Sequence, residues 1–407
     1  MIMANNSNKN KCNVPHLRFP EFSGEWEKNN LSKFSSKITK KNKGNVIQNV
    51  LCNSANLGII PQNDYFDRDI ANADNTDSYY IIEQGDFVYN PRKSTAAPYG
   101  PVNIYNGEKP GIISPLYLCF SVLNISPSFL FYRFKSSVWH PYVYSHGDTG
   151  VRFDRVSIKD DVFFDMPIYT PTQNEQEKIA TLLSLIDERI ATQNKIIKKY
   201  ESLIKGIMVE LQKQGLKKGT WKKVFLNDIL TERNERNSNL YQVFSVSVSQ
   251  GIINQVDHLG RSFSAKDTSK YNVVHYGDLV YTKSPTGSFP YGIVKQSLNR
   301  ERVAVSPLYG VYVPNSLAIG VYLHKYFMSE INTHNYLHPL IQKGAKNTIN
   351  ITNQRFLENR VPMPLDSNEL LLISKLLRSV NDKIRHEQNM LQEYQKQKQY
   401  LLRQMFI

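Results

Sequence analysis

The sequence is built twice from a segment of about 195 residues, and this duplication restricts the possible folds more than any other feature. The letters SPLY occur at Ser114–Tyr117 and again at Ser306–Tyr309, and at the same offset of 192 PYG at Pro98–Gly100 falls on PYG at Pro290–Gly292. From residue 85 to residue 117 the copies align without a gap and 12 of 33 residues match, far above chance. A repeat of this length is a whole domain with a long element attached, not a solenoid unit.

The similarity continues on both sides of this aligned region. Trp26 in GEWEKNN matches Trp221 in GTWKKVF, and NEQEKIATLLSLID from Asn174 resembles NELLLISKLLRSVN from Asn368 at an offset of 194. Each half begins with short runs of aromatic and β-branched residues that are broken by Asn, Asp, Gly and Pro. This composition predicts short strands and turns with occasional helix.

Each half ends in a long stretch whose apolar residues alternate at spacings of four and three, which is the seam of a coiled coil. The first stretch covers about residues 174–211, and the second repeats its register shifted by 194. The predicted seam has one polar position in the first helix, Gln193, and two in the second, Glu387 and Lys398. The seam residues are Ile179, Leu183, Ile186, Ile190, Gln193, Ile197, Ile204, Leu377, Val380, Ile384, Glu387, Leu391 and Leu401.

Each predicted helix has one apolar stripe, so we expect the two helices to pack on each other. Because the second globular segment lies between them in the chain, an antiparallel pair is favoured, and Gln193 and Glu387 would lie close together and fix the register. The predicted fold class is α+β: two tandem similar mixed α/β domains, separated by two long antiparallel coiled-coil helices and related by a pseudo-twofold axis. Two similar domains on a rod of roughly 55 Å suit an extended ligand such as DNA.

The repeat also predicts the domain boundaries. We expect a disordered lead at residues 1–14, a first domain at 15–172, a first long helix at 173–214, a second domain at 215–366 and a second long helix at 367–407. The basic segment at residues 213–223 is expected to connect the first helix to the second domain.

The net charge of the chain is +14, and a protein this basic often binds a polyanion. The alternative is a basic surface without a partner. The sequence has no run of eighteen apolar residues, which excludes a membrane span, and its polar N-terminus lacks the apolar core of a secretory signal. Its three cysteines (Cys12, Cys52 and Cys119) are far apart, which argues against a zinc site or a disulfide framework and fits a reducing, cytoplasmic compartment.

In its motifs and their order the chain resembles the specificity subunits of type I restriction-modification systems. VPHLRFPEFSGEWEKNNLSKF and GTWKKVFLNDIL look like the starts of the two target-recognition domains of that family. The GDFVYN and GDLVYT motifs, the two SPLY copies and the helix start PIYTPTQNEQEKIA are also similar to the family. The resemblance covers nearly the whole chain, from about Pro15 to the C-terminus.

The resemblance implies a DNA-reading subunit in which each domain reads one half of a bipartite, asymmetric target while the helices set the gap. It implies two copies of a methyltransferase (modification) subunit that bind around the helices and methylate adenine with S-adenosylmethionine. It also implies a restriction subunit with ATP- and Mg-dependent translocase and nuclease activity. The chain itself would be non-catalytic, without a cofactor or a metal, and associated with the nucleoid when on DNA.

Cations and polar side chains in two pairs of matched loops are the candidates for contact with DNA. The first pair follows the GDFVY and GDLVY strands, and its loops keep their length while their letters differ, as expected of two readers of different sequences. The second pair is rich in glycine, and the resemblance places it near the DNA; a solvated hairpin tip is the alternative. The candidates are Arg92, Lys93, Ser94, Tyr99, His146, Thr149 and Arg152 in the first domain and Lys283, Ser284, Thr286, Tyr291, Lys343, Lys346 and Asn347 in the second.

No motif in the sequence indicates catalysis. There is no phosphate-binding GxxxxGK[ST] loop and no HExxH, and Arg92 and Lys93 in NPRK replace the proline and aromatic residue of a methyltransferase NPP[YF] loop. Two further hypotheses stay open beside the DNA-reading subunit of a restriction complex. One is a tandem-domain coiled-coil adaptor that joins proteins without touching DNA, and the other is the recognition subunit of a related system with a differently organised nuclease.

Overall fold

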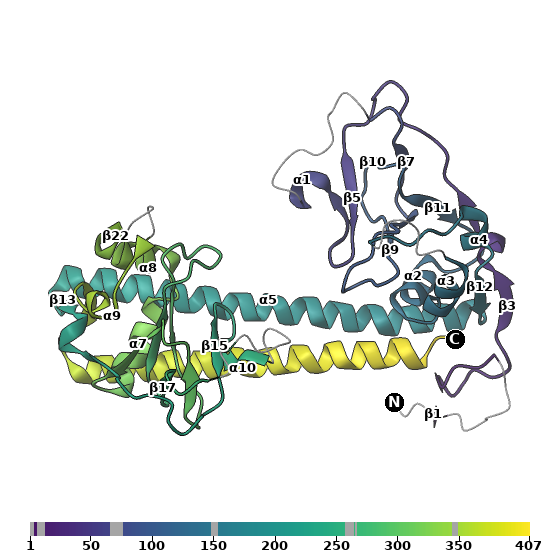
Figure 1. The fold of residues 1–407 in the computed structure, drawn as a ribbon. Coiled ribbons are helices and arrows are strands. Elements are labelled where there is room, and N and C mark those ends of the chain that lie inside the picture. Colours follow the sequence, from purple (N-terminus) through teal and green to yellow (C-terminus); the bar gives the residue numbers. More distant parts are fainter. Residues whose placement is uncertain are drawn as a thin grey trace. The chain divides into compact units, whose positions relative to one another are not determined.

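The structure is a computed structural model that describes residues 4–5, 13–65, 76–147, 154–256, 264, 267–343 and 349–407. The chain divides into two compact units. Unit 1 consists of Met1–Thr192 and Met390–Ile407, and unit 2 consists of Gln193–Asn389. Each unit therefore contains one sheet-bearing domain together with a part of each of two long helices, α5 (Gln173–Lys218) and α10 (Ser367–Gln404) (Figure 1).

The domain of unit 1 alternates short strands with short helices. Its elements are β1 (Ala4–Asn5), β2 (Leu17–Arg18), β3 (Glu27–Asn30), β4 (Ser35–Lys37), β5 (Val50–Ser54), β6 (Gly58–Pro61), α1 (Gln62–Tyr65), β7 (Tyr80–Ile82), β8 (Phe87–Tyr89), β9 (Val102–Ile104), β10 (Gly111–Ile113), β11 (Leu118–Val122), α2 (Pro127–Lys135), α3 (His140–His146), α4 (Asp160–Phe164) and β12 (Pro167–Thr170). The strands form two four-stranded sheets in the orders β4-β11-β8-β9 and β6-β5-β10-β7, and the pairs β12-β3 and β1-β2.

The domain of unit 2 repeats this order of elements. It contains β13 (Trp221–Phe225), β14 (Leu230–Glu232), β15 (Phe244–Ser247), β16 (Gly251–Asn254), β17 (Asn272–Val274), β18 (Leu279–Thr282), β19 (Ile293–Gln296), β20 (Val303–Val305), β21 (Gly310–Pro314), α7 (Leu317–Tyr326), α8 (Glu330–Leu337), β22 (Gln342–Lys343), β23 (Ile349–Asn350), α9 (Asn353–Phe356) and β24 (Arg360–Pro364). Its largest sheet has the order β14-β21-β18-β19, beside the pairs β15-β16, β17-β20, β13-β24 and β22-β23.

For the sheet β4-β11-β8-β9 and its counterpart β14-β21-β18-β19, the duplication read from the sequence is therefore a duplication of strand order and register. Tyr89 of β8 pairs with Leu118 of β11, and at the offset of 192 Tyr281 of β18 pairs with Gly310 of β21. The mixed α/β fold, with a sheet-containing domain before and another after the long helix α5, confirms the predicted fold class.

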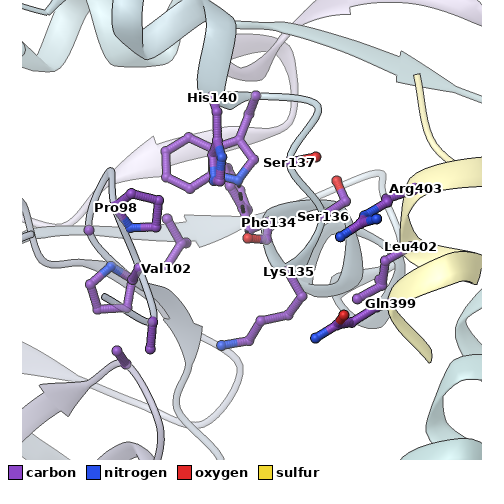
Figure 2. Close-up of a pocket in the computed structure, with 16 residues that line it drawn as sticks. Pro98, Val102, Phe134, Lys135, Ser136, Ser137, His140, Gln399, Leu402 and Arg403 are labelled. Atoms are coloured by element: carbon purple, nitrogen blue, oxygen red, sulfur yellow. Dashed lines mark hydrogen bonds between the residues drawn. The ribbon is translucent and has the colours of Figure 1, made fainter. Parts of the chain in front are cut away.

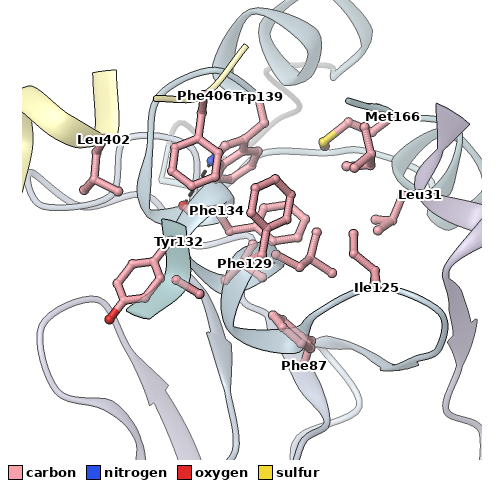
Figure 3. Packing of buried hydrophobic residues seen from close by; sticks show 14 of the residues in the cluster. Leu31, Phe87, Ile125, Phe129, Tyr132, Phe134, Trp139, Met166, Leu402 and Phe406 are labelled. Carbon is pink, nitrogen blue, oxygen red and sulfur yellow. Dashed lines mark hydrogen bonds between the residues drawn. The ribbon is translucent and has the colours of Figure 1, made fainter. Parts of the chain in front are cut away.

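The core of unit 1 closes around aromatic side chains from elements that are distant in sequence (Figure 3). Phe87 of β8 stacks on Phe120 of β11 with ring centroids 5.3 Å apart. Phe129 of α2 meets Phe406, beyond the end of α10, at 5.3 Å. Both members of the second pair are almost fully buried, so residues that follow α10 complete the core of the first domain.

Within each unit, α5 and α10 run antiparallel. In unit 1, Ile179 near the start of α5 and Met405 beyond the end of α10 share one core cluster, and further along α5 the Asp187 carboxylate accepts from the Lys398 ammonium at 2.5 Å. In unit 2, the Gln193 side-chain amide donates to the backbone carbonyl of Glu387 at 3.1 Å and also to its carboxylate. The two residues expected to lie together in an antiparallel pair thus do so.

The side chains at the predicted seam positions are buried or half-buried. Buried side chains belong to Ile179, Leu183, Ile186, Gln193, Ile197, Ile204, Leu377, Ile384 and Leu401. Half-buried ones belong to Ile190, Val380, Glu387 and Leu391. The helix α5 ends at Lys218 and not at the expected residue 214, because Lys213–Lys218, expected as a connector, has the composition to continue the helix.

The SPLY segments are turns, one in each domain. Ser114 carbonyl accepts from the Tyr117 amide at 3.1 Å, and Ser306 carbonyl accepts from the Tyr309 amide at 3.0 Å. Each turn joins two consecutive strands of its domain, β10 to β11 and β20 to β21. The shared motif is thus part of the common framework of the two domains.

Candidate nucleic-acid interface

The first candidate loop, residues 90–101, connects β8 to β9 in unit 1; we call it the first hairpin loop. Its tip is closed by mutual backbone hydrogen bonds between Ser94 and Ala97. The Arg92 side chain is exposed, and its Nε lies 3.8 Å from an Asp154 carboxylate oxygen. Since an ion pair this exposed contributes little to stability, the Arg92 guanidinium is available to an external anion.

The segment that follows the second candidate loop of unit 1 packs against the first hairpin loop. The Lys93 amide donates to the Asp154 carbonyl at 2.8 Å, and the Val156 amide donates to the Pro91 carbonyl at 2.9 Å. The structure therefore brings Arg92 and Lys93 next to the chain that leaves the glycine-rich loop. Thr149 and Arg152 of that loop lie outside the described residues.

His146 closes α3 at the other side of the glycine-rich loop. Its exposed ring stacks on Tyr142 with centroids 4.1 Å apart, and its Nδ1 lies 2.9 Å from the Tyr142 carbonyl. This side chain is held by its own helix and still faces solvent.

The second hairpin loop, residues 283–292, connects β18 to β19 in unit 2 and has the same tip. Thr286 and Phe289 exchange backbone hydrogen bonds as Ser94 and Ala97 do. Ser284 and Thr286 are exposed, whereas Lys283 is half-buried and its pKa is lowered by burial. The backbone of Lys343 belongs to β22, and Lys346 and Asn347 lie outside the described residues.

A shared PYG turn closes each hairpin loop on its strand. Gly100 and Gly292 have φ of +84° and +99°, and a Cβ at either position would collide with the carbonyl oxygen of Asn90 or Thr282. Beside these glycines, the backbone carbonyls of Tyr99 and Tyr291 accept hydrogen bonds from buried tyrosines. The Tyr89 hydroxyl donates to the Tyr99 carbonyl at 2.9 Å, and the Tyr281 hydroxyl donates to the Tyr291 carbonyl at 2.8 Å. Because both glycines allow this close approach of the two backbone segments, the two hairpin loops share one backbone conformation at the turn and differ in the side chains at their tips.

The two candidate tyrosines also pack against histidine rings. The ring centroid of Tyr99 lies 4.8 Å from that of His140. The ring centroid of Tyr291 lies 5.2 Å from that of His334 and 5.9 Å from that of His338. Both tyrosines are half-buried, so each has a packing role that exists whether or not it touches DNA.

A cluster of buried cations was missed by the sequence reading. Lys295 of β19 is 4% exposed and Lys325 of α7 is 6% exposed, and burial lowers the pKa of each to about 8. Lys325 donates to the Asn381 side chain at 2.7 Å, and burial holds the pKa of the adjacent His324 well below its usual value. Asn103 stands in the first copy where Lys295 stands in the second, and this difference was the signal available in the alignment.

The described residues hold no group of three or more histidine, cysteine or carboxylate side chains placed to bind a metal ion. Cys52 and Cys119 are buried free thiols, and burial raises the pKa of Cys52 to about 11. Among the described helices, none is both long and apolar enough to cross a membrane.

Comparisons with known proteins give a match of fold. No protein-family model matches the sequence, and no curated protein matches it. The S subunit of a type I restriction-modification system from M. genitalium aligns with a TM-score of 0.57 and 12% identity over 97% of this chain and 99% of that chain. The chain has the fold of a type I restriction-modification S subunit.

A second solved structure supports the same fold. It comes from work on complex assembly and conformational transition of the type I R-M system, and it aligns with a TM-score of 0.50 and 12% identity over 94% of this chain and 97% of that chain. The S-subunit fold thus extends over both domains and both long helices.

Proposed function

We propose that this chain is the DNA sequence-recognition subunit of a type I restriction-modification complex. The observation that carries the proposal is the pair of hairpin loops, which share one backbone frame and differ in the side chains at their tips. A common frame with different tips suits two readers of unlike half-sites. The net charge of +14 and the S-subunit fold support the same function.

In this proposal each domain reads one half of a bipartite, asymmetric target. The antiparallel helices fix the gap between the halves and dock two methyltransferase subunits, and a restriction subunit joins the complex. S-adenosylmethionine, ATP and Mg act on those partner subunits, while this chain contributes DNA contacts and no catalytic group. The candidate contacts are the fourteen side chains of the four loops named from the sequence.

Exchange of one loop tests the proposal. Replacing Lys283–Pro290 with the corresponding loop of a relative that has a different target should change one half of the methylated sequence, because only the second domain carries that loop. Methylome sequencing of a host that expresses the complete complex gives the readout. A host in which both halves change would contradict the assignment of one half-site to each domain.

The matched control exchanges the same number of residues in the first hairpin loop, which should change the other half-site. If neither exchange alters the methylated sequence and the purified complex does not bind DNA, the protein adaptor becomes the better explanation of the fold.

A further inference from the structure

A cavity of about 240 Å³ lies in unit 1 between the first hairpin loop and the last turns of α10 (Figure 2). Pro98 and Val102 are on one side of it, and Gln399, Leu402 and Arg403 of α10 are on the other. Residues 134–137, 139 and 140, from the end of α2 to the start of α3, form another wall, and Ala55 also lines the cavity. The cavity therefore touches both the candidate reading loop and the long helix.

The polar side chains in this cavity are suited to an anion. Lys135 and Arg403 are its cations, Gln399 and Ser137 add an amide and a hydroxyl, and no carboxylate lines it. In the part of the chain that the structure describes, no carboxylate forms an ion pair with Arg403. Lys135 donates to the Asn103 side chain at 2.5 Å, which leaves two of its three N–H groups for a ligand.

Among the described residues, Lys135 has no carboxylate as a direct ion-pair partner. Its ammonium is largely buried, and burial with the nearby Lys398 cation lowers its pKa to about 8. The Asp187 carboxylate nearby is already bonded to Lys398 and to the Tyr132 hydroxyl. A bound anion would give Lys135 a direct negative partner.

The second copy carries different residues at the matched positions. Phe289 stands where Ala97 stands, and its ring is only 6% exposed, so it fills space that alanine leaves open. At the offset of 194 along the long helices, Val209 stands in the place of Arg403. Both the small residue and the cation that make the cavity are therefore features of the first copy.

We propose that this cavity binds a phosphate group, held by Arg403 and Lys135, that comes from a DNA strand or from a free phosphate ester. A guanidinium fork and an ammonium are the usual partners of phosphate oxygens. The apolar walls from Pro98, Val102 and Leu402 suit the sugar or base attached to that phosphate. The inference deepens the proposed DNA-recognition function, and it rests on that function only where the phosphate comes from DNA.

Two variants borrow the residues of the second copy and so test the site with side chains that the fold already uses. Ala97→Phe fills the cavity, and Arg403→Val removes an exposed cation without touching the core. Arg385→Val is the matched control, because Arg385 is an exposed arginine on the same helix and pairs only with Asp382 among the described residues. All variants are made in the full-length chain, and circular dichroism confirms that each is folded.

The first measurement is calorimetric titration of each protein with adenosine monophosphate and with inorganic phosphate. The second is the affinity of each protein for a DNA duplex at several salt concentrations. If the ligand is a free phosphate ester, adenosine monophosphate binds the wild-type protein saturably. Ala97→Phe and Arg403→Val then weaken this binding at least tenfold, and Arg385→Val leaves it unchanged. If the ligand is a DNA phosphate, the monophosphate does not bind in this way. Instead, Arg403→Val loses five- to tenfold in affinity for the duplex, and the slope of its log affinity against log salt concentration is smaller by about one.

The proposal is overturned if Arg403→Val behaves as Arg385→Val does in both measurements. The function proposed above fails separately, when the wild-type chain binds no duplex, alone or with its partner subunits. Even if the wild-type chain binds no duplex, the titrations with adenosine monophosphate and inorganic phosphate still test whether the cavity binds a free phosphate ester. If Ala97→Phe does not fold, Arg403→Val carries the comparison alone.

Discussion

At the residue scale, the two copies differ in how they hold the glutamate at the start of each long helix. In the first copy the Glu175 carboxylate is fully buried and accepts from Arg18 at 2.8 and 2.7 Å and from the Trp26 indole at 3.3 Å. In the second copy Glu369 accepts from the Trp221 indole at 2.8 Å. The tryptophan and glutamate are common to both, and the arginine is an addition of the first copy.

We predict that Glu175→Gln lowers the free energy of unfolding by about 3–5 kcal/mol, because it leaves the Arg18 guanidinium buried without its counter-charge. Glu369→Gln is the matched control and should cost about 1–2 kcal/mol, since it weakens one charged hydrogen bond to an indole. Urea unfolding followed by tryptophan fluorescence measures both. Equal losses would show that Arg18 adds nothing to the anchor.

Lys295 gives a prediction with a pH dependence. Its folded pKa of about 8 lies below the unfolded value near 10.5, so between these pH values the unfolded chain binds more protons and stability rises with pH. Lys295→Asn, the residue of the first copy, should raise the free energy of unfolding at pH 7 by about 1–3 kcal/mol and flatten the rise between pH 8 and 10.5. Urea midpoints at pH 7, 8.5 and 10 measure this.

The control for Lys295→Asn is Lys270→Asn, which changes an exposed lysine in the same unit. This control should leave both the stability and its slope with pH almost unchanged. If the stability of Lys295→Asn rises between pH 8 and 10 as steeply as that of the wild type and of Lys270→Asn, Lys295 is not the group responsible.

At the element scale, the hairpin loops depend on their closing glycines. Gly100→Ala should lower the free energy of unfolding by about 2–4 kcal/mol, because it combines a positive φ with a collision against a backbone carbonyl. Gly58→Ala is the control, with a φ of +76° and open space around its Cβ, and should cost about 1 kcal/mol. Thermal unfolding of the two variants compares them, and a smaller loss for Gly100→Ala would mean that the turn relaxes.

The long helices and the duplicated domains could be predicted from the sequence because each places similar residues at a fixed spacing, which is four and three in the helices and about 195 between the domains. The four-three pattern even selected Gln193 and Glu387, which the structure joins by hydrogen bonds. Contacts between residues without such spacing could not be predicted. Arg18 and Glu175 are 157 positions apart, and the arginine of this pair is an addition of the first copy. The cavity likewise depends on Ala97 and Arg403 together.

At the scale of the whole molecule, the helices are the proposed spacer between the two reading domains. Inserting one heptad after Gln193 in α5 and a matching heptad before Glu387 in α10 keeps the seam in register and lengthens both helices. We predict that methylome sequencing then finds the same two half-sites with a wider gap. Changed half-sites, or an unchanged gap, would contradict the spacer role.

The burial of Leu401, Met405 and Phe406 in the core of the first domain has a consequence for synthesis on the ribosome. The remaining core residues of that domain leave the ribosome more than 200 residues earlier, since the last before this tail is Ile186. At about 5–20 residues per second, that interval lasts on the order of ten to forty seconds. Throughout it, the nascent first domain has an apolar surface around Phe129 that its own chain cannot yet cover, which is where a chaperone would bind.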